Sequence, residues 1–172
     1  WATTYYGEPS GIGLALNHHP RRVAGQNLKV GVVGLGCGTL ATYGKPGDEI
    51  RFYEINPEVI RVAREYFTYC KDSKAQVDIV LGDARIMLER EPSQQFDVLA
   101  IDSFSSDAIP MHLLTRECFE LFLRHLKRDG LLCIHISNRY HGIQLQVAVG
   151  YVHSHIQPLP GAGCRGSRTG QV

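Results

Sequence analysis

The sequence predicts an α/β protein in which a mostly parallel sheet carries helices on both faces. Two observations lead to this fold class. Five short apolar runs recur along the chain, and most of the segments between them have helical periodicity. Strands that alternate with helices at this spacing form βαβ units, which build parallel sheets. We therefore expect a Rossmann-like, doubly wound sheet, truncated at its C-terminal end.

The five expected strands are 28–34, 49–55, 76–84, 96–102 and 131–137. A helix follows the second strand, with Asn56 as its cap and Pro57 in its first turn. A short helix is expected around 85–91. Another begins after Thr115, carries an apolar stripe and stops at Gly130.

Three segments are expected along the 172-residue chain. Residues 1–27 form an N-terminal lead-in, and residues 28–140 form the α/β domain. Residues 141–172 are rich in Gly, Pro, Ser and Arg, which predicts an irregular, disordered tail. Because the chain opens at Trp1 without an initiator Met, we interpret it as a fragment or a processed piece.

Composition excludes several classes of function. A net charge of +1 gives no electrostatic basis for binding nucleic acid. The five cysteines form no C-x-x-C pair, which argues against a zinc site and favours reduced thiols in the cytoplasm. No apolar stretch reaches the 18 residues of a membrane span, and no signal peptide is present. We expect no metal and no membrane contact from this segment.

The stretch "GLGCGT" follows the first strand and precedes a predicted helical stretch. Its glycines, Gly34, Gly36 and Gly38, let the backbone approach a ligand closely. Glu54 ends the second strand 20 residues after Gly34, where an acid can bind both ribose hydroxyls. The alternative interpretations are a tight turn and an acid that only favours the start of a helix.

The nature of the nucleotide follows from spacing. A dinucleotide site requires G-x-G-x-x-G, whereas this loop has G-x-G-x-G. Asp83 and Ala84 close the third strand, where a carboxylate and a backbone N–H could meet the amine and a ring nitrogen of adenine. Asp83 could instead cap the following helix, or do both. We expect a single adenine nucleoside.

Two acids, Asp102 and Asp107, leave the fourth strand through "DSFSSDAIP". They could belong to a solvated turn or bind a positively charged substrate. We interpret His112 and His135 as structural residues. Tyr6 is a candidate for lining the mouth of the substrate site.

The motifs "VGVVGLGCGT", "FYEINP", "VLGDAR" and "FDVLAIDSFSSDAIP" resemble, in order and spacing, those of class I S-adenosylmethionine-binding enzymes. The resemblance is closest to spermidine-synthase-like proteins (polyamine aminopropyltransferases), which are often fused to membrane segments. It implies that the three glycines lie under the sulfur-bearing tail of the cofactor, Glu54 holds the ribose and Asp83 meets adenine. It also implies that Asp102 helps to deprotonate the attacking amine and that Asp107 holds the diamine.

Two positions differ from the family pattern. Cys37 stands where the family loop has Asp, and the two acids lie five positions apart instead of three. Both changes weaken the expectation that decarboxylated S-adenosylmethionine and putrescine are the substrates. S-adenosylmethionine-dependent methyl transfer, a non-catalytic nucleoside-binding module and, less favoured, a dinucleotide dehydrogenase stay open. The expected partners are a small-molecule amine and a second copy of the chain in a homodimer.

Overall fold

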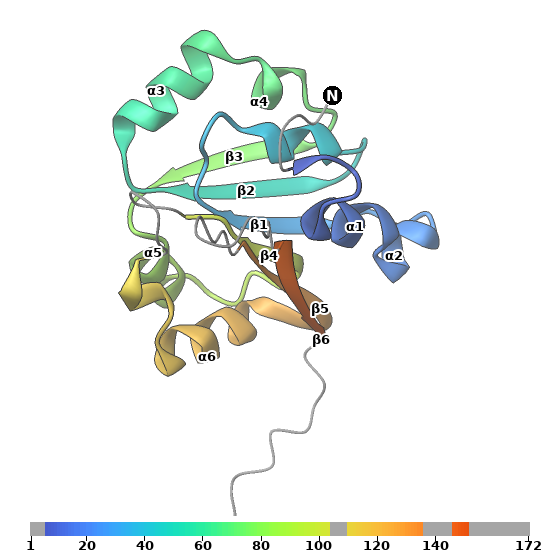
Figure 1. Ribbon diagram of the computed structural model, residues 1–172, viewed down its shortest axis with the longest axis vertical. Coiled ribbons are helices and arrows are strands. Elements are labelled where there is room, and N and C mark those ends of the chain that lie inside the picture. Colours follow the sequence, from blue (N-terminus) through green and yellow to red (C-terminus); the bar gives the residue numbers. More distant parts are fainter. Residues whose placement is uncertain (1–5, 104–109, 136–145, 152–172) are drawn as a thin grey trace, which may run out of the picture.

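The computed structural model describes residues 6–103 and 110–135, together with the backbone of residues 146–151. Its centre is a six-stranded sheet in the order β3-β2-β1-β4-β5-β6. Every neighbouring pair from β3 to β5 is parallel, and β6 is antiparallel to β5 (Figure 1). The predicted doubly wound, mostly parallel fold is confirmed. The strands are β1 (Lys29–Val33), β2 (Glu49–Glu54), β3 (Gln76–Leu81), β4 (Phe96–Ile101), β5 (Leu126–His135) and β6 (Gln146–Tyr151).

Helices cover both faces of the sheet. Buried residues of α1 (Gly11–His18), the 3-10 turn η2 (Thr39–Tyr43) and α3 (Pro57–Tyr66) share one apolar core with the sheet. Residues of α5 (Ala84–Arg90) and α6 (Arg116–His125) form a second core on the other face (Figure 1). The short helices are α2 (Pro20–Val23), α4 (Tyr69–Asp72) and the 3-10 turn η3 (Met111–Leu113).

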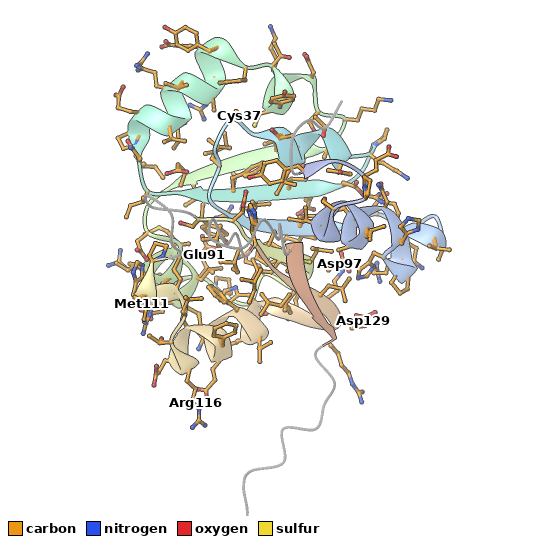
Figure 2. The ribbon with its side chains drawn as sticks, viewed as in Figure 1. Cys37, Glu91, Asp97, Met111, Arg116 and Asp129 are labelled. Carbon is orange, nitrogen blue, oxygen red and sulfur yellow. The ribbon has the colours of Figure 1, made fainter. Side chains whose placement is uncertain are left out.

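Strand β4 is the spine of the sheet. All six of its residues are buried, as its nearly continuous apolar sequence predicts for a strand covered on both faces. It pairs with β1 on one side and β5 on the other. In Figure 2, Asp97, near the start of β4, lies at one end of the strands, and Met111, which comes after β4 in the chain, lies at the other end. The loops after the strands therefore gather at the Met111 edge.

The predicted helix starts are confirmed. Asn56 Oδ1 accepts from the backbone N–H of Glu58 at 2.9 Å, and Pro57 occupies the first turn of α3. Thr115 Oγ1 accepts from the backbone N–H of Cys118 at 3.3 Å, which caps α6. These caps satisfy N–H groups that have no partner within the helix.

Three local predictions need correction. The helix after Thr115 ends at His125 and not at Gly130, because Leu126 turns extended and pairs with Phe96 of β4. The glycine loop leads into η2, a 3-10 turn of five residues, and not into an α-helix. Within residues 141–172, expected to be irregular, residues 146–151 form β6, because the antiparallel edge of β5 supplies hydrogen-bond partners.

The lead-in segment is built into the domain by α1 and by a buried ion pair. Ile12, Ala15 and Leu16 of α1 join the first core. Arg22 in α2 donates both terminal nitrogens to Asp48, at 3.0 and 2.6 Å, and Asp48 is 1% exposed. Asp48 also accepts from the backbone N–H of Leu28 at 2.8 Å. The pair therefore ties residues before the sheet to the starts of β1 and β2.

Candidate functional site at the carboxyl edge of the sheet

Hydrogen bonds just beyond the strand ends bring four segments together. The N–H of Gly34 donates to the carbonyl of Tyr53 at 2.9 Å, and the N–H of Asp102 donates to Val33 at 2.8 Å. The N–H of Gly82 donates to Glu54 at 2.8 Å. Because all four strands are parallel, the predicted site residues after β1, β2, β3 and β4 lie along one edge. This edge of an open parallel sheet is where ligands bind.

The glycine loop has a backbone that only glycine adopts readily. Gly34, Gly36 and Gly38 have φ of +97°, +54° and +86°. A Cβ on Gly34 would lie 2.5 Å from the carbonyl oxygen of Asp102, and one on Gly38 would lie 2.6 Å from Cys70 Sγ. A Cβ on Gly36 would meet nothing within 4 Å. Two glycines are therefore required by packing, and the third leaves open space at the tip of the loop.

Glu54 connects the glycine loop to the end of β2. Its side chain accepts from the backbone N–H of Leu35 at 3.0 Å and from that of Asn56 at 2.9 Å, one at each carboxylate oxygen. Glu54 is only 8% exposed. Each oxygen can accept more than one hydrogen bond, so these contacts orient the carboxylate and leave capacity for ribose hydroxyls.

Asp83 has two partners. One oxygen caps α5 by accepting from the backbone N–H of Ile86 at 3.0 Å, and the other lies 3.0 Å from His112 Nε2. Ala84, the first residue of α5, is buried beneath the same turn. The cap, weighed as an alternative from sequence, is present. Binding of adenine by Asp83 and Ala84 stays a prediction.

Asp102 lies within a partly buried polar cluster that joins three distant parts of the chain. The phenol of Tyr6 donates to Asp102 Oδ2, and His135 Nδ1 lies 2.7 Å from Asp102 Oδ1. The Asp102 and His135 side chains are 8% and 14% exposed. The rings of Tyr6 and His135 meet edge to face, with centroids 6.4 Å apart. Asp107, the second predicted acid, lies outside the described residues.

Sequence reasoning missed several residues at this edge. The expectation that His135 and His112 are structural stays a prediction, and the sequence did not show that each contacts one of the predicted carboxylates. Ile55 directly follows Glu54 in the chain, and Leu81 pairs with Glu54 in the sheet. Their apolar side chains are 64% and 55% exposed. Ile55 could have been singled out from its position directly after Glu54.

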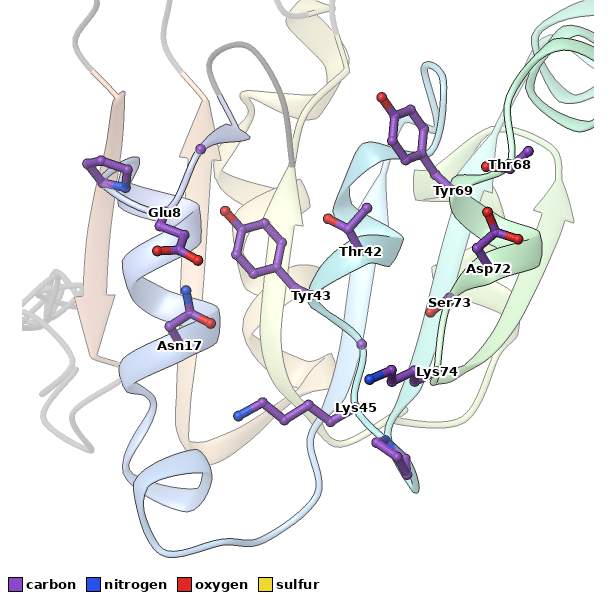
Figure 3. A pocket seen from close by; sticks show the side chains of 14 residues that line it. Glu8, Asn17, Thr42, Tyr43, Lys45, Thr68, Tyr69, Asp72, Ser73 and Lys74 are labelled. Carbon is purple, nitrogen blue, oxygen red and sulfur yellow. The ribbon is translucent and has the colours of Figure 1, made fainter. Parts of the chain in front are cut away.

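A large groove lies beside this cluster. It has a volume of about 1000 Å³ and runs between the N-terminal segment, η2 and α4 (Figure 3). None of Glu54, Asp83 and Asp102 lines it. Tyr43, on its wall, donates its phenol to the main-chain carbonyl of Tyr6, whose own phenol reaches Asp102. The groove therefore lies next to the polar cluster of Tyr6, Asp102 and His135, and the three predicted carboxylates do not line it.

Acidic and basic side chains both line the groove. Glu8 and Tyr43 point toward one another at one end, and Lys45 and Lys74 lie at the other end (Figure 3). Burial and the nearby Glu8 carboxylate raise the pKa of Tyr43 above its usual value, so this phenol keeps its proton. Within the described ranges, no three His, Cys, Asp or Glu side chains gather as metal ligands. No helix there is long and apolar enough to cross a membrane.

Comparison with known families gives a match over most of this domain. Residues 15–146 match the model of the spermine/spermidine synthase domain. A polyamine aminopropyltransferase of Vibrio vulnificus is 30% identical over 125 residues, which are 70% of this chain and 39% of that protein. An eEF1A lysine and N-terminal methyltransferase of Xenopus laevis is 32% identical over 99 residues, 55% of this chain and 14% of that protein. The chain thus spans about two fifths, or less, of these relatives.

Solved structures give the same fold. A probable spermidine synthase from Corynebacterium glutamicum superposes with a TM-score of 0.58 at 27% identity, covering 70% of this chain and 45% of that one. Human methyltransferase-like protein 13 in complex with SAH superposes with a TM-score of 0.65 at 20% identity, over 80% of this chain and 67% of that one. At that identity the second likeness concerns the fold alone.

Proposed function

This chain belongs to the spermine/spermidine synthase family, and from that premise we propose that it transfers an aminopropyl group from decarboxylated S-adenosylmethionine to a polyamine such as putrescine. The observation that carries the proposal is the set of three carboxylates, Glu54, Asp83 and Asp102, at one edge of the sheet. A protonated amine and a sulfonium are both cations, so an edge lined by carboxylates favours binding both. Decarboxylated S-adenosylmethionine lacks the carboxylate of S-adenosylmethionine, so it brings no further anion to this edge.

The described residues fit such a nucleoside. The open space at Gly36 gives room above the loop, and the buried Glu54 carboxylate keeps hydrogen-bonding capacity for a ribose. Asp83 and Ala84 are proposed to receive the adenine, with the exposed Ile55 packing on its face. When bound, the sulfonium supplies an electrophilic carbon. The chain's own residues must then hold the amine and take away its proton.

Asp102 is proposed to act in that proton removal, and Asp107 to hold the far ammonium of the diamine. A polyamine is protonated at neutral pH, so the attacking nitrogen must lose a proton before its lone pair can react. The burial of Asp102 supports this role, because a carboxylate removed from water interacts more strongly with an ammonium. Tyr6 contacts Asp102 and is the described residue proposed for substrate binding.

The test is transfer from decarboxylated S-adenosylmethionine to putrescine, followed by mass spectrometry. Asp102→Asn should lower turnover by roughly 10²–10⁴, because it removes the charge that assists proton removal, and leave the affinity for methylthioadenosine nearly unchanged. Asp107→Asn should mainly raise the KM for the diamine. The matched control is Asp129→Asn, which alters an exposed acid of β5 far from this edge (Figure 2).

A second candidate is methyl transfer from S-adenosylmethionine to a larger acceptor. The groove of about 1000 Å³ favours it, because that volume exceeds what a short diamine fills. A relative that methylates lysine and N-termini, 32% identical over its aligned part, supports it as well. Wild-type protein that forms no spermidine but methylates a peptide amine would favour this candidate. Nucleoside binding without any transfer would favour a non-catalytic module.

A further inference from the structure

We propose that the imidazole of His135, oriented by Asp102, is the base that takes the proton from the attacking amine. This inference rests on the proposed function, because it names the residue that performs one step of that reaction. It starts from the register of the sheet. Ile101 of β4 pairs with Ile134 of β5, so the next residues, Asp102 and His135, emerge side by side at the carboxyl edge.

The contact between them fixes how the imidazole is protonated. A carboxylate only accepts hydrogen bonds, so His135 Nδ1, 2.7 Å from Asp102 Oδ1, must carry the hydrogen. In the neutral ring the lone pair is then on Nε2. A carboxylate behind Nδ1 also stabilises the imidazolium that forms when Nε2 gains a proton, which is how an acid supports a catalytic histidine.

Asp102 is poorly arranged to accept the proton itself. Its Oδ2 already accepts from the phenol of Tyr6, and its Oδ1 faces the His135 ring. Each oxygen thus already binds a protein group. A carboxylate oxygen can accept a further hydrogen bond, but taking up the proton itself would remove the charge that strengthens both contacts. The side chain is 8% exposed. The described contacts of the imidazole include Asp102, from the end of β4, and Tyr6, from the N-terminal segment. Both contacts hold the ring in place.

The proposed step balances as follows. His135 Nε2 takes one proton from the substrate ammonium and becomes an imidazolium paired with Asp102. The freed lone pair of the amine forms the new C–N bond as the C–S bond of the sulfonium breaks, and the electron pair of that bond stays on the neutral sulfur. The product amine keeps its remaining protons, and the imidazolium releases its proton to water. In this scheme His135 is the catalytic residue, and Asp102 is a positioning residue.

The kinetic test is His135→Asn, which keeps a nitrogen donor near the position of Nδ1 but removes the basic nitrogen. We expect turnover to fall by roughly 10²–10⁴ and the acidic limb of the pH–rate profile to disappear, with little change in the affinity for methylthioadenosine. In His135→Ala, free imidazole should restore part of the rate. The control is His18→Asn, at the exposed end of α1. A His135→Asn variant that keeps both its rate and its acidic limb would overturn the inference and return the role of base to Asp102.

Nitrogen NMR of the histidine side chains in the unmodified chain tests the inference without turnover. We expect His135 to be in the tautomer with hydrogen on Nδ1, and Asp102→Asn to disturb that preference. Hydrogen on Nε2 in the neutral protein would overturn the inference even if aminopropyl transfer is found. Conversely, absence of transfer to any amine would contradict the proposed function, while the NMR result would still report on the Asp102–His135 pair.

Discussion

Replacing Glu54 by Gln should weaken nucleoside binding and loosen the glycine loop at the same time. The carboxylate uses one oxygen for Leu35 in the loop and the other for Asn56 at the start of α3. A Gln side chain has one oxygen, so one of these two N–H groups would face an NH₂ group. An unsatisfied buried donor costs about 1–3 kcal/mol in folding free energy. Lost hydrogen bonds from the ribose hydroxyls to a charged carboxylate cost about 1.5–3 kcal/mol, or roughly 10- to 150-fold in Kd.

Calorimetric titration with methylthioadenosine measures the binding loss, and thermal unfolding of the same protein measures the cost to the loop. Glu49→Gln is the matched control, since Glu49 begins the same strand at the opposite edge and forms an ion pair with the partly exposed Lys29. It should change neither quantity appreciably. Glu54→Gln protein that binds methylthioadenosine as tightly as the unmodified chain would refute a role for Glu54 in holding the ribose.

Three further predictions concern stability and reactivity. Asp48→Asn should cost about 3–5 kcal/mol of unfolding free energy, because it leaves the buried Arg22 guanidinium without its charge partner. Burial alone would raise the pKa of Asp48, but hydrogen bonds from Arg22 and two backbone amides outweigh it and lower the pKa. The contribution of the ionised Asp48 to folding stability is therefore complete above the unfolded pKa, about 3.9. It is lost as pH falls through the lower folded pKa, which favours acid unfolding. At pH 8 a maleimide should label Cys37 faster than Cys133, because burial raises the thiol pKa of Cys133 to about 12. Methylthioadenosine should slow the labelling of Cys37 and leave that of Cys133 unchanged. Equal labelling rates, or no protection of Cys37, would count against the loop site. Removing residues 153–172, which lack apolar periodicity, should shift the melting temperature by less than the roughly 2–4 °C expected for 1 kcal/mol, and a larger loss would show a packed element there.

The sequence predicted the fold where a single residue pattern determined the structure. Apolar runs such as 96–102 identified the central strands, and Asn56 and Thr115 marked helix starts through side-chain caps that act locally. The end of α6 could not be predicted in the same way. Its apolar stripe continues through Leu126, but pairing of that residue with Phe96 is a contact between distant parts of the chain. Strand β6 likewise depends on the free edge of β5.

The candidate site shows the same division. The tight loop could be predicted from its glycines, because few other residue types adopt a backbone with positive φ. Asp102 was identified by its place at a strand end, but its partners Tyr6 and His135 are 96 and 33 positions away in the sequence. Their contact follows from strand order and register, which no local pattern contains. A single chain therefore indicated which carboxylates to consider, whereas only the structure revealed which side chains support them.

The most direct measurement is calorimetric titration of the unmodified chain with decarboxylated S-adenosylmethionine and, separately, with S-adenosylmethionine. The three carboxylates at the sheet edge disfavour a donor that carries its own carboxylate. We predict that the decarboxylated form binds at least about tenfold more tightly, a difference of roughly 1.4 kcal/mol. Tighter binding of S-adenosylmethionine would contradict aminopropyl transfer and favour methyl transfer, and tighter binding of NAD than of either would contradict the single-nucleoside site.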